Sequence, residues 1–179
     1  MRRRTFVCGS ASAAVSLFAP KVAFAGDRDF WIRDRELWLR RPETLQECRV
    51  TFWSEGRFDP DSYVALCYML RDAEESITPP ITPRLLNLLF AVQRWGVLLN
   101  GRSVPADVLS GYRTRDHNNR TEGAVVGSQH TLFRAADCRF PGFTPKEIAR
   151  MASHFGWGGV GTYPTFTHID VGPVRHWIG

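Results

Sequence analysis

The sequence has no uninterrupted hydrophobic run long enough to cross a membrane. Its most apolar stretch lies near the N-terminus, is short, and is broken by Pro20 and Lys21, whereas a membrane-spanning helix needs about 20 consecutive apolar residues. Beyond Gly26 the sequence also lacks a run of basic residues interleaved with aromatic residues, the pattern that neutralises a phosphate backbone. We therefore expect no nucleic-acid partner and no transmembrane segment in the mature protein.

The sequence also lacks the paired cysteines that are typical of zinc-binding modules. Outside the N-terminal segment it has three cysteines, Cys48, Cys67 and Cys138, and an odd number cannot complete a disulfide framework. A single Cys48–Cys67 bridge is compatible with an oxidising compartment. Export of an already folded chain favours the other interpretation, in which all three are buried free thiols.

Residues 1–25 have the layout of an export signal. Arginines are followed by a short apolar segment and by Ala23-Phe24-Ala25, a small-residue cleavage signal. Arg3-Arg4-Thr5-Phe6 also resembles a twin-arginine signal, although an ordinary secretory signal or an uncleaved anchor has similar features. We expect cleavage before Gly26 and a periplasmic or secreted protein.

The positive charge of the chain lies mostly in this N-terminal segment. The formal net charge is +5, and residues 1–25 hold four basic residues and no acidic one, so the remainder carries only about +1. A hydrophobic fraction of 44% over 179 residues is enough to fill the core of one ordinary domain. We expect a single domain over residues 26–179, acting as a monomer.

Three segments have helical patterns, and several short extended segments surround them. Because the helices and strands do not alternate in a βαβ order, the sequence predicts an α+β fold with a small, mainly antiparallel sheet flanked by about three helices. The expected helices lie within residues 59–75, 81–96 and 144–156. The expected strands lie within residues 34–60, 108–113, 134–140, 158–164 and 166–172.

Two histidines and an aspartate stand out as a candidate zinc site. His130 and Asp137 are seven residues apart, and His168 lies on a late strand with Asp170 two residues on, on the same strand face. Two imidazoles and one carboxylate suit a catalytic Zn²⁺, because three protein ligands leave a fourth position for water. Such an ion acidifies water and polarises a carbonyl group. Asp170 is a candidate general base or a partner that orients a ligand.

Five motifs then occur in a fixed order, and together they carry a resemblance. They are SGYRT at Ser110–Thr114, SQH at Ser128–His130, AAD at Ala135–Asp137, GGVGTYP at Gly158–Pro164 and HIDVGPVRHW at His168–Trp177. In this order they resemble the M15-type zinc peptidases of the YcbK-like group, which are similar to murein endopeptidases. The upstream segments 52–72 and 81–93 are similar to that group as well.

The resemblance implies a zinc-dependent peptidase with the fold of zinc D-Ala-D-Ala peptidases and hedgehog-type domains. It implies Zn²⁺ held by His130, Asp137 and His168, and hydrolysis of peptidoglycan stem or cross-link peptides by a murein endopeptidase or D,D-carboxypeptidase. It also implies that Arg113 contacts substrate. A guanidinium group can clamp a carboxylate or stabilise an oxyanion, and the alternative for Arg113 is an ion pair with a neighbour such as Asp116.

Two positions depart from the family pattern. Phe133 stands where relatives have a glycine, in the pattern His-x-x-Gly-x-Ala-x-Asp, and Thr165 stands where many have an acid three residues before the last histidine. Threonine cannot act as a general base at neutral pH, so Asp170 takes that role by default. Because of these departures, two alternative functions stay open. One is a catalytically inactive module that binds the cell wall, and the other is a hydrolase of D-amino-acid dipeptides or of other peptides.

A few further residues have roles that the pattern leaves open. His117, in a polar loop, is the other histidine that could reach the site, and Ser128 could orient the first ligand. Trp157 and Tyr163 flank the glycine-rich turn and are candidates for a substrate groove. The turn itself lacks the lysine of a phosphate-binding loop.

Overall fold

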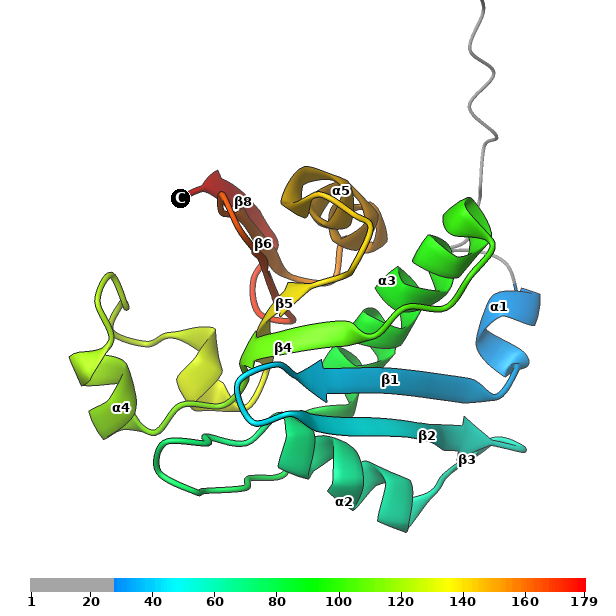
Figure 1. The fold of residues 1–179 in the computed structure, drawn as a ribbon, viewed down its shortest axis with the longest axis horizontal. Coiled ribbons are helices and arrows are strands. Elements are labelled where there is room, and N and C mark those ends of the chain that lie inside the picture. Colours follow the sequence, from blue (N-terminus) through cyan, green and yellow to red (C-terminus); the bar gives the residue numbers. More distant parts are fainter. Residues whose placement is uncertain (1–27) are drawn as a thin grey trace, which may run out of the picture.

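A mixed eight-stranded sheet runs through residues 28–179, the part of the chain that the computed structural model describes (Figure 1). The strand order is β3-β2-β1-β4-β5-β7-β6-β8. The strands are β1 Arg35–Arg41, β2 Gln46–Ser54, β3 Arg57–Phe58, β4 Ala106–Ser110, β5 Ala135–Arg139, β6 Gly159–Thr162, β7 Thr167–Asp170 and β8 Arg175–Ile178. The predicted export signal lies outside the described residues.

The α+β class is confirmed, but the sheet is larger than expected and mixed. Strands β1 and β4 are parallel, as are β6 and β8, while the other neighbouring pairs are antiparallel. The extra strands are at the edges of the sheet. β3 has two residues and β8 is largely exposed, so neither carries the hydrophobic alternation by which a strand is recognised in a sequence.

The described residues form five α-helices and one 3₁₀ helix. The helices are α1 Arg28–Ile32, α2 Pro60–Met69, α3 Pro83–Asn100, α4 Arg115–Arg120 and α5 Pro145–Phe155, and the 3₁₀ helix η1 is Gln129–Leu132. The three expected helices correspond to α2, α3 and α5. The two unexpected ones, α1 and α4, are each too short to show a helical hydrophobic period. No helix of the described residues has the length and apolar character to span a bilayer.

Local signals account for most of the helix ends. Thr144 and Glu147 form a capping box at the start of α5, and Gly156 ends it with a positive φ of 62°. The expected end of α3 at Gly96 is wrong, since the helix continues to Asn100 and ends at Gly101 with φ 69°. Gly96 instead packs in mid-helix against the ring of Phe143, where a Cβ would lie 3.1 Å from that ring.

The helices cover one face of the sheet, and the candidate site lies on the other. Leucines of α2 and α3 form one core with Leu37, Leu39 and the apolar face of α5. Ile169 belongs to this core, and because side chains alternate along a strand, His168 and Asp170 point to the opposite face. Among the described cysteines, Cys67 and Cys138 are buried and Cys48 is half-buried, and all three are free thiols, as expected.

Candidate functional site

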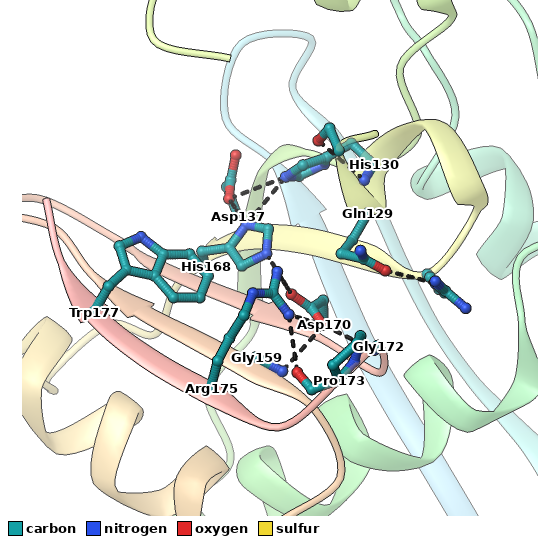
Figure 2. A network of polar contacts seen from close by, with 12 residues as sticks. Gln129, His130, Asp137, Gly159, His168, Asp170, Gly172, Pro173, Arg175 and Trp177 are labelled. Carbon is teal, nitrogen blue, oxygen red and sulfur yellow. Dashed lines mark hydrogen bonds and ion pairs between the residues drawn. The ribbon is translucent and has the colours of Figure 1, made fainter. Parts of the chain in front are cut away.

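Two adjacent strands and a short 3₁₀ helix bring three predicted ligands together. Asp137 on β5 is the direct cross-strand partner of His168 on β7, and η1 carries His130 to the same point (Figure 2). The Nδ1 atom of His168 lies 2.9 Å from Oδ1 of Asp137 and 3.1 Å from Nε2 of His130. The third separation, from His130 Nε2 to Asp137 Oδ1, is 3.3 Å. All three side chains are buried.

The outer hydrogen bonds of the two imidazoles fix which nitrogens face inward. Nδ1 of His130 lies 2.5 Å from the carbonyl oxygen of Gly111, which only accepts, so Nδ1 carries the proton and Nε2 carries a lone pair. Nε2 of His168 lies 2.9 Å from a carboxylate oxygen of Asp170, and in the neutral imidazole with its proton on that nitrogen the lone pair is on Nδ1. Two imidazole lone pairs and one carboxylate oxygen therefore converge on one point, and a cation must balance them.

This geometry fits a zinc ion. Zinc–ligand distances of about 2.0–2.2 Å give ligand–ligand separations of roughly 3.3–3.6 Å around a tetrahedral ion, and the three observed separations of 2.9–3.3 Å are close to that range. In the described part of the chain, His130, Asp137 and His168 form the group of His, Cys, Asp and Glu side chains that is close enough to hold a metal.

The electrostatics of the cluster favour a neutral His130 and an ionised Asp137, whereas His168 holds its proton more tightly. Burial lowers the pKa of His130, which favours the neutral imidazole. Burial acts in the same direction on His168, but the carboxylates of Asp137 and Asp170 outweigh it and raise its pKa. Burial would raise the pKa of Asp137, yet the facing imidazoles of His130 and His168 hold it well below its usual range. Asp137 is thus an anion that attracts either a proton or a metal ion to this point.

Arg113 holds the second oxygen of Asp137. Its Nη2 lies 2.8 Å from Asp137 Oδ2, and its Nε donates to Ser110 Oγ at 2.8 Å. Arg113 thus forms its ion pair with Asp137 and not with Asp116. Because Arg113 occupies Oδ2, Asp137 presents a single oxygen, Oδ1, to the cluster.

Asp170 lies behind His168, on the side of the ring away from Asp137 (Figure 2). It is fully buried, and its Oδ1 accepts from the backbone N–H groups of Gly159 at 3.0 Å and Gly172 at 2.8 Å. Its Oδ2 accepts from His168 and, at 2.7 Å, from Arg175. Burial alone would raise the pKa of Asp170, but these partners outweigh it and lower the pKa to about 2. Asp170 is therefore an ionised, fully engaged carboxylate.

The cluster opens into a groove of about 580 Å³. Tyr163, Phe166 and Trp177 line it with aromatic rings, and the segment 121–125 lines another part of it. Tyr163 thus meets the expectation for a groove residue. Trp157 packs instead on Trp31, with ring centroids 5.2 Å apart.

Three other side chains singled out in the sequence lie apart from the cluster. His117 pairs with the buried Asp72 through Nδ1 at 2.9 Å. Thr165 lies in the exposed turn between β6 and β7, where its carbonyl oxygen accepts from Arg139. Ser128 caps η1, since its hydroxyl accepts from the N–H of His130 at 3.3 Å, so it does orient the segment that carries the first ligand.

Phe133 has a backbone conformation to which glycine is suited. Its φ is 58°, in the left-handed region, which is where glycine costs least. The ring stacks on Tyr112 at 4.9 Å, and the carbonyl group accepts from the N–H of Thr82 at 3.0 Å. A phenylalanine at this position therefore carries local backbone strain.

Sequence reasoning missed Arg175, Glu122 and the function of the glycines in β6. A Cβ at Gly159 would overlap Arg175 and Asp170, and a Cβ at Gly161 would overlap the ring of Trp177. The glycine-rich turn thus makes room for side chains of β8. The spacing of Arg175 and Trp177, two residues apart like the glycines with which they pair, is a signal that could have revealed this.

Comparisons with known proteins identify the family of this chain. The family model described as Peptidoglycan L,D-endopeptidase MepK, of the M15 peptidases, matches residues 31–177. The chain is 33% identical to the Peptidoglycan L,D-endopeptidase MepK of Escherichia coli K12 over 151 residues, which cover 81% of each protein. It is 31% identical to the Probable peptidoglycan L,D-endopeptidase MepK of Haemophilus influenzae, over 82% of this chain and 81% of that protein. No solved structure matches. The chain belongs to the MepK-type family of M15 peptidases.

Proposed function

We propose that this protein is an exported, zinc-dependent endopeptidase that hydrolyses peptide bonds in the stem or cross-link peptides of peptidoglycan. The observation that carries the proposal is the convergence of His130 Nε2, Asp137 Oδ1 and His168 Nδ1 at the floor of a groove. The curated relatives support the substrate class, since their names describe peptidoglycan L,D-endopeptidases. The same names favour an endopeptidase over a D,D-carboxypeptidase.

In this proposal His130, Asp137 and His168 hold the metal ion. When bound, zinc supplies Lewis acidity that polarises a carbonyl group and makes water more acidic. Arg113 keeps Asp137 oriented through Oδ2 and, because it also lines the groove, its guanidinium group is available to a substrate carboxylate or a developing oxyanion.

The general-base role expected for Asp170 is reassigned. Both oxygens of Asp170 are engaged, and the carboxyl group faces the outer nitrogen of His168, so we assign Asp170 to orienting His168. The carboxylates that line the groove, within the described residues, are Asp137 and Glu122. With Asp137 as a ligand, Glu122 remains as the groove carboxylate to which we assign proton transfer from water.

The test starts from the purified protein without its expected leader. Its metal content is measured, and the protein is then incubated with cross-linked peptidoglycan fragments and, separately, with D-Ala-D-Ala. We expect about one zinc ion per chain, release of peptides from the cross-linked fragments, and loss of both properties in His130→Ala. His154→Ala is the matched control, because His154 packs on Trp95, outside the cluster.

Three results would change the assignment. Zinc and peptidoglycan binding without any released peptide would support an inactive wall-binding module. Cleavage of D-Ala-D-Ala alone would move the substrate to a free dipeptide. Unchanged metal content and cleavage in His130→Ala would refute the proposed site.

A further inference from the structure

Arg175 is the cationic partner of the carboxylate that orients His168. The guanidinium group donates two hydrogen bonds to the Asp170 carboxylate, from Nη2 to Oδ2 at 2.7 Å and from Nη1 to Oδ1 at 3.2 Å. The oxygen Oδ2 is the same atom that accepts from Nε2 of His168 at 2.9 Å. Arg175 is therefore linked to the imidazole of His168 by two hydrogen bonds that share Oδ2 of Asp170 (Figure 2).

Strand β6 is shaped to leave space for this contact. Gly159 is the cross-strand partner of Arg175, and a side chain at Gly159 would overlap both the guanidinium group and the Asp170 carboxylate. Gly161 similarly leaves space for the ring of Trp177, over which the guanidinium carbon of Arg175 lies at 5.0 Å from the centroid. Two glycines and one aromatic ring thus fix the place of Arg175.

Arg175 differs from the backbone partners of Asp170, the N–H groups of Gly159 and Gly172, because it also faces the groove. Asp170 is wholly buried, whereas 40% of the Arg175 side chain is exposed, and Arg175 and Trp177 both line the groove. The ring of Trp177 lies 5.2 Å from that of His168. The same side chain therefore contacts the orienting carboxylate and the space that a substrate would occupy.

We propose that Arg175 is a positioning residue, which acts through Asp170 to hold His168 with its Nδ1 lone pair directed at the metal position. With Arg175 in place, the Asp170 carboxylate is fixed by two nitrogens and directs Oδ2 at Nε2–H of His168. Without it, the carboxylate keeps the backbone N–H groups of Gly159 and Gly172 but is free to turn away from the imidazole. Loss of such an outer partner typically lowers metal affinity about 10–100-fold.

The inference rests on the proposed metal site, and its test reads out metal binding directly. The metal-free protein is titrated with Zn²⁺ against a competing chelator, and Co²⁺ is then used to record the visible absorption of the bound ion. We expect Arg175→Gln to weaken Zn²⁺ binding about 10-fold or more and to change the Co²⁺ spectrum. Arg175→Lys, which keeps the positive charge but has one donor nitrogen in place of the two that contact Asp170, should recover part of the affinity.

Arg139→Gln is the matched control, since it removes the same charge from β5 while its side chain contacts the carbonyl group of Thr165. It should leave Zn²⁺ affinity and the Co²⁺ spectrum unchanged. Near-ultraviolet circular dichroism of Arg175→Gln and Arg175→Lys checks that both variants keep the native packing. Arg175→Lys provides a second variant if Arg175→Gln does not fold.

The outcomes separate the two proposals. If the unmodified protein binds no Zn²⁺, the proposed function fails. If it binds Zn²⁺ and Arg175→Gln and Arg175→Lys bind it equally well with an unchanged spectrum, only the role of Arg175 fails. A variant that keeps its metal affinity and loses cleavage through KM alone would overturn the positioning role and make Arg175 a substrate contact.

Discussion

Asp137 and His168 are direct partners across the β5–β7 pair, and the atoms they direct at each other, Oδ1 and Nδ1, are 2.9 Å apart. A strand register therefore sets the distance between two proposed metal ligands. Since register is rigid once one face of a sheet is buried, this pair is preorganised, whereas His130 is positioned by the short helix η1.

Asp137→Asn should abolish tight zinc binding. The substitution keeps the shape of the side chain but removes the anion, and it leaves Arg113 without its ion pair. We expect metal affinity to fall by more than the roughly 100-fold that loss of an outer partner costs, as measured by competition with a chelator. Asp116→Asn, at an exposed position of α4, serves as the control. Retention of stoichiometric zinc by Asp137→Asn would argue against this ligand.

Glu122→Gln should separate proton transfer from metal binding. The side chain lines the groove on a segment that contributes no ligand to the cluster. Loss of a general base typically costs about 100-fold or more in rate, so we expect kcat to fall on that scale while zinc content stays at one ion per chain. The comparison variant is Glu55→Gln, in the exposed β2–β3 turn. An unchanged kcat would remove Glu122 from the mechanism.

Phe133 should be a position where glycine is more stabilising than alanine. Both substitutions remove the stacking on Tyr112, but alanine retains the left-handed strain at φ 58° and glycine does not. Left-handed backbone costs a residue with a Cβ about 1 kcal/mol or slightly more, so Phe133→Gly should exceed Phe133→Ala by about that amount in the free energy of unfolding. Urea denaturation of both variants measures it, and the reverse order would contradict the backbone assignment.

Asp72→Asn should destabilise the protein in a pH-dependent way. Burial raises the pKa of Asp72, but the N–H groups of Thr114 and Glu75 and the ring of His117 outweigh it, so the net pKa is lowered. A lowered pKa in the folded state means that the ionised carboxylate adds stability above its unfolded pKa of about 3.9, and that this contribution disappears as the pH falls below that value.

We expect Asp72→Asn to cost about 1.5–3 kcal/mol at pH 7, the usual range for hydrogen bonds to a charged group. The difference from the unmodified protein should persist in urea titrations at pH 5 and shrink at pH 3. A cost that does not vary with pH would show that the charge of Asp72 contributes nothing. Asp61→Asn, on the surface of α2, should show no such trend.

The helices were predictable because their signals are local. Thr144, Pro145 and Glu147 mark the start of α5 within four residues of sequence, and a capping box needs no tertiary information. Gly96 was misread as the end of α3 because the ring of Phe143, which explains that glycine, comes from a distant part of the chain. The edge strands β3 and β8 were hidden for a similar reason, since their pairing partners alone define them.

The meeting of three side chains in one cluster was predictable from the sequence, whereas the hydrogen bonds around them were not. His130, Asp137 and His168 follow from motif order, but the carbonyl group of Gly111 that sets the tautomer of His130 is invisible in a residue pattern. Asp170 was expected at the site because it shares a strand face with His168. Which side of the imidazole it faces depends on Arg175 and on the backbone of Gly159, and only the assembled sheet shows this.

The three proposed ligands come from two strands and one short helix, so metal binding at this site would couple the stability of the fold to metal supply. An ion that binds the folded chain alone acts as a reversible cross-link between η1, β5 and β7. At a free metal concentration 1,000 times the Kd, such an ion adds about 4.1 kcal/mol to the free energy of unfolding, and at concentrations below Kd it adds almost nothing. Metal scarcity would then leave a chain that opens more often and is degraded sooner, so the abundance of the protein would follow the zinc level of its compartment.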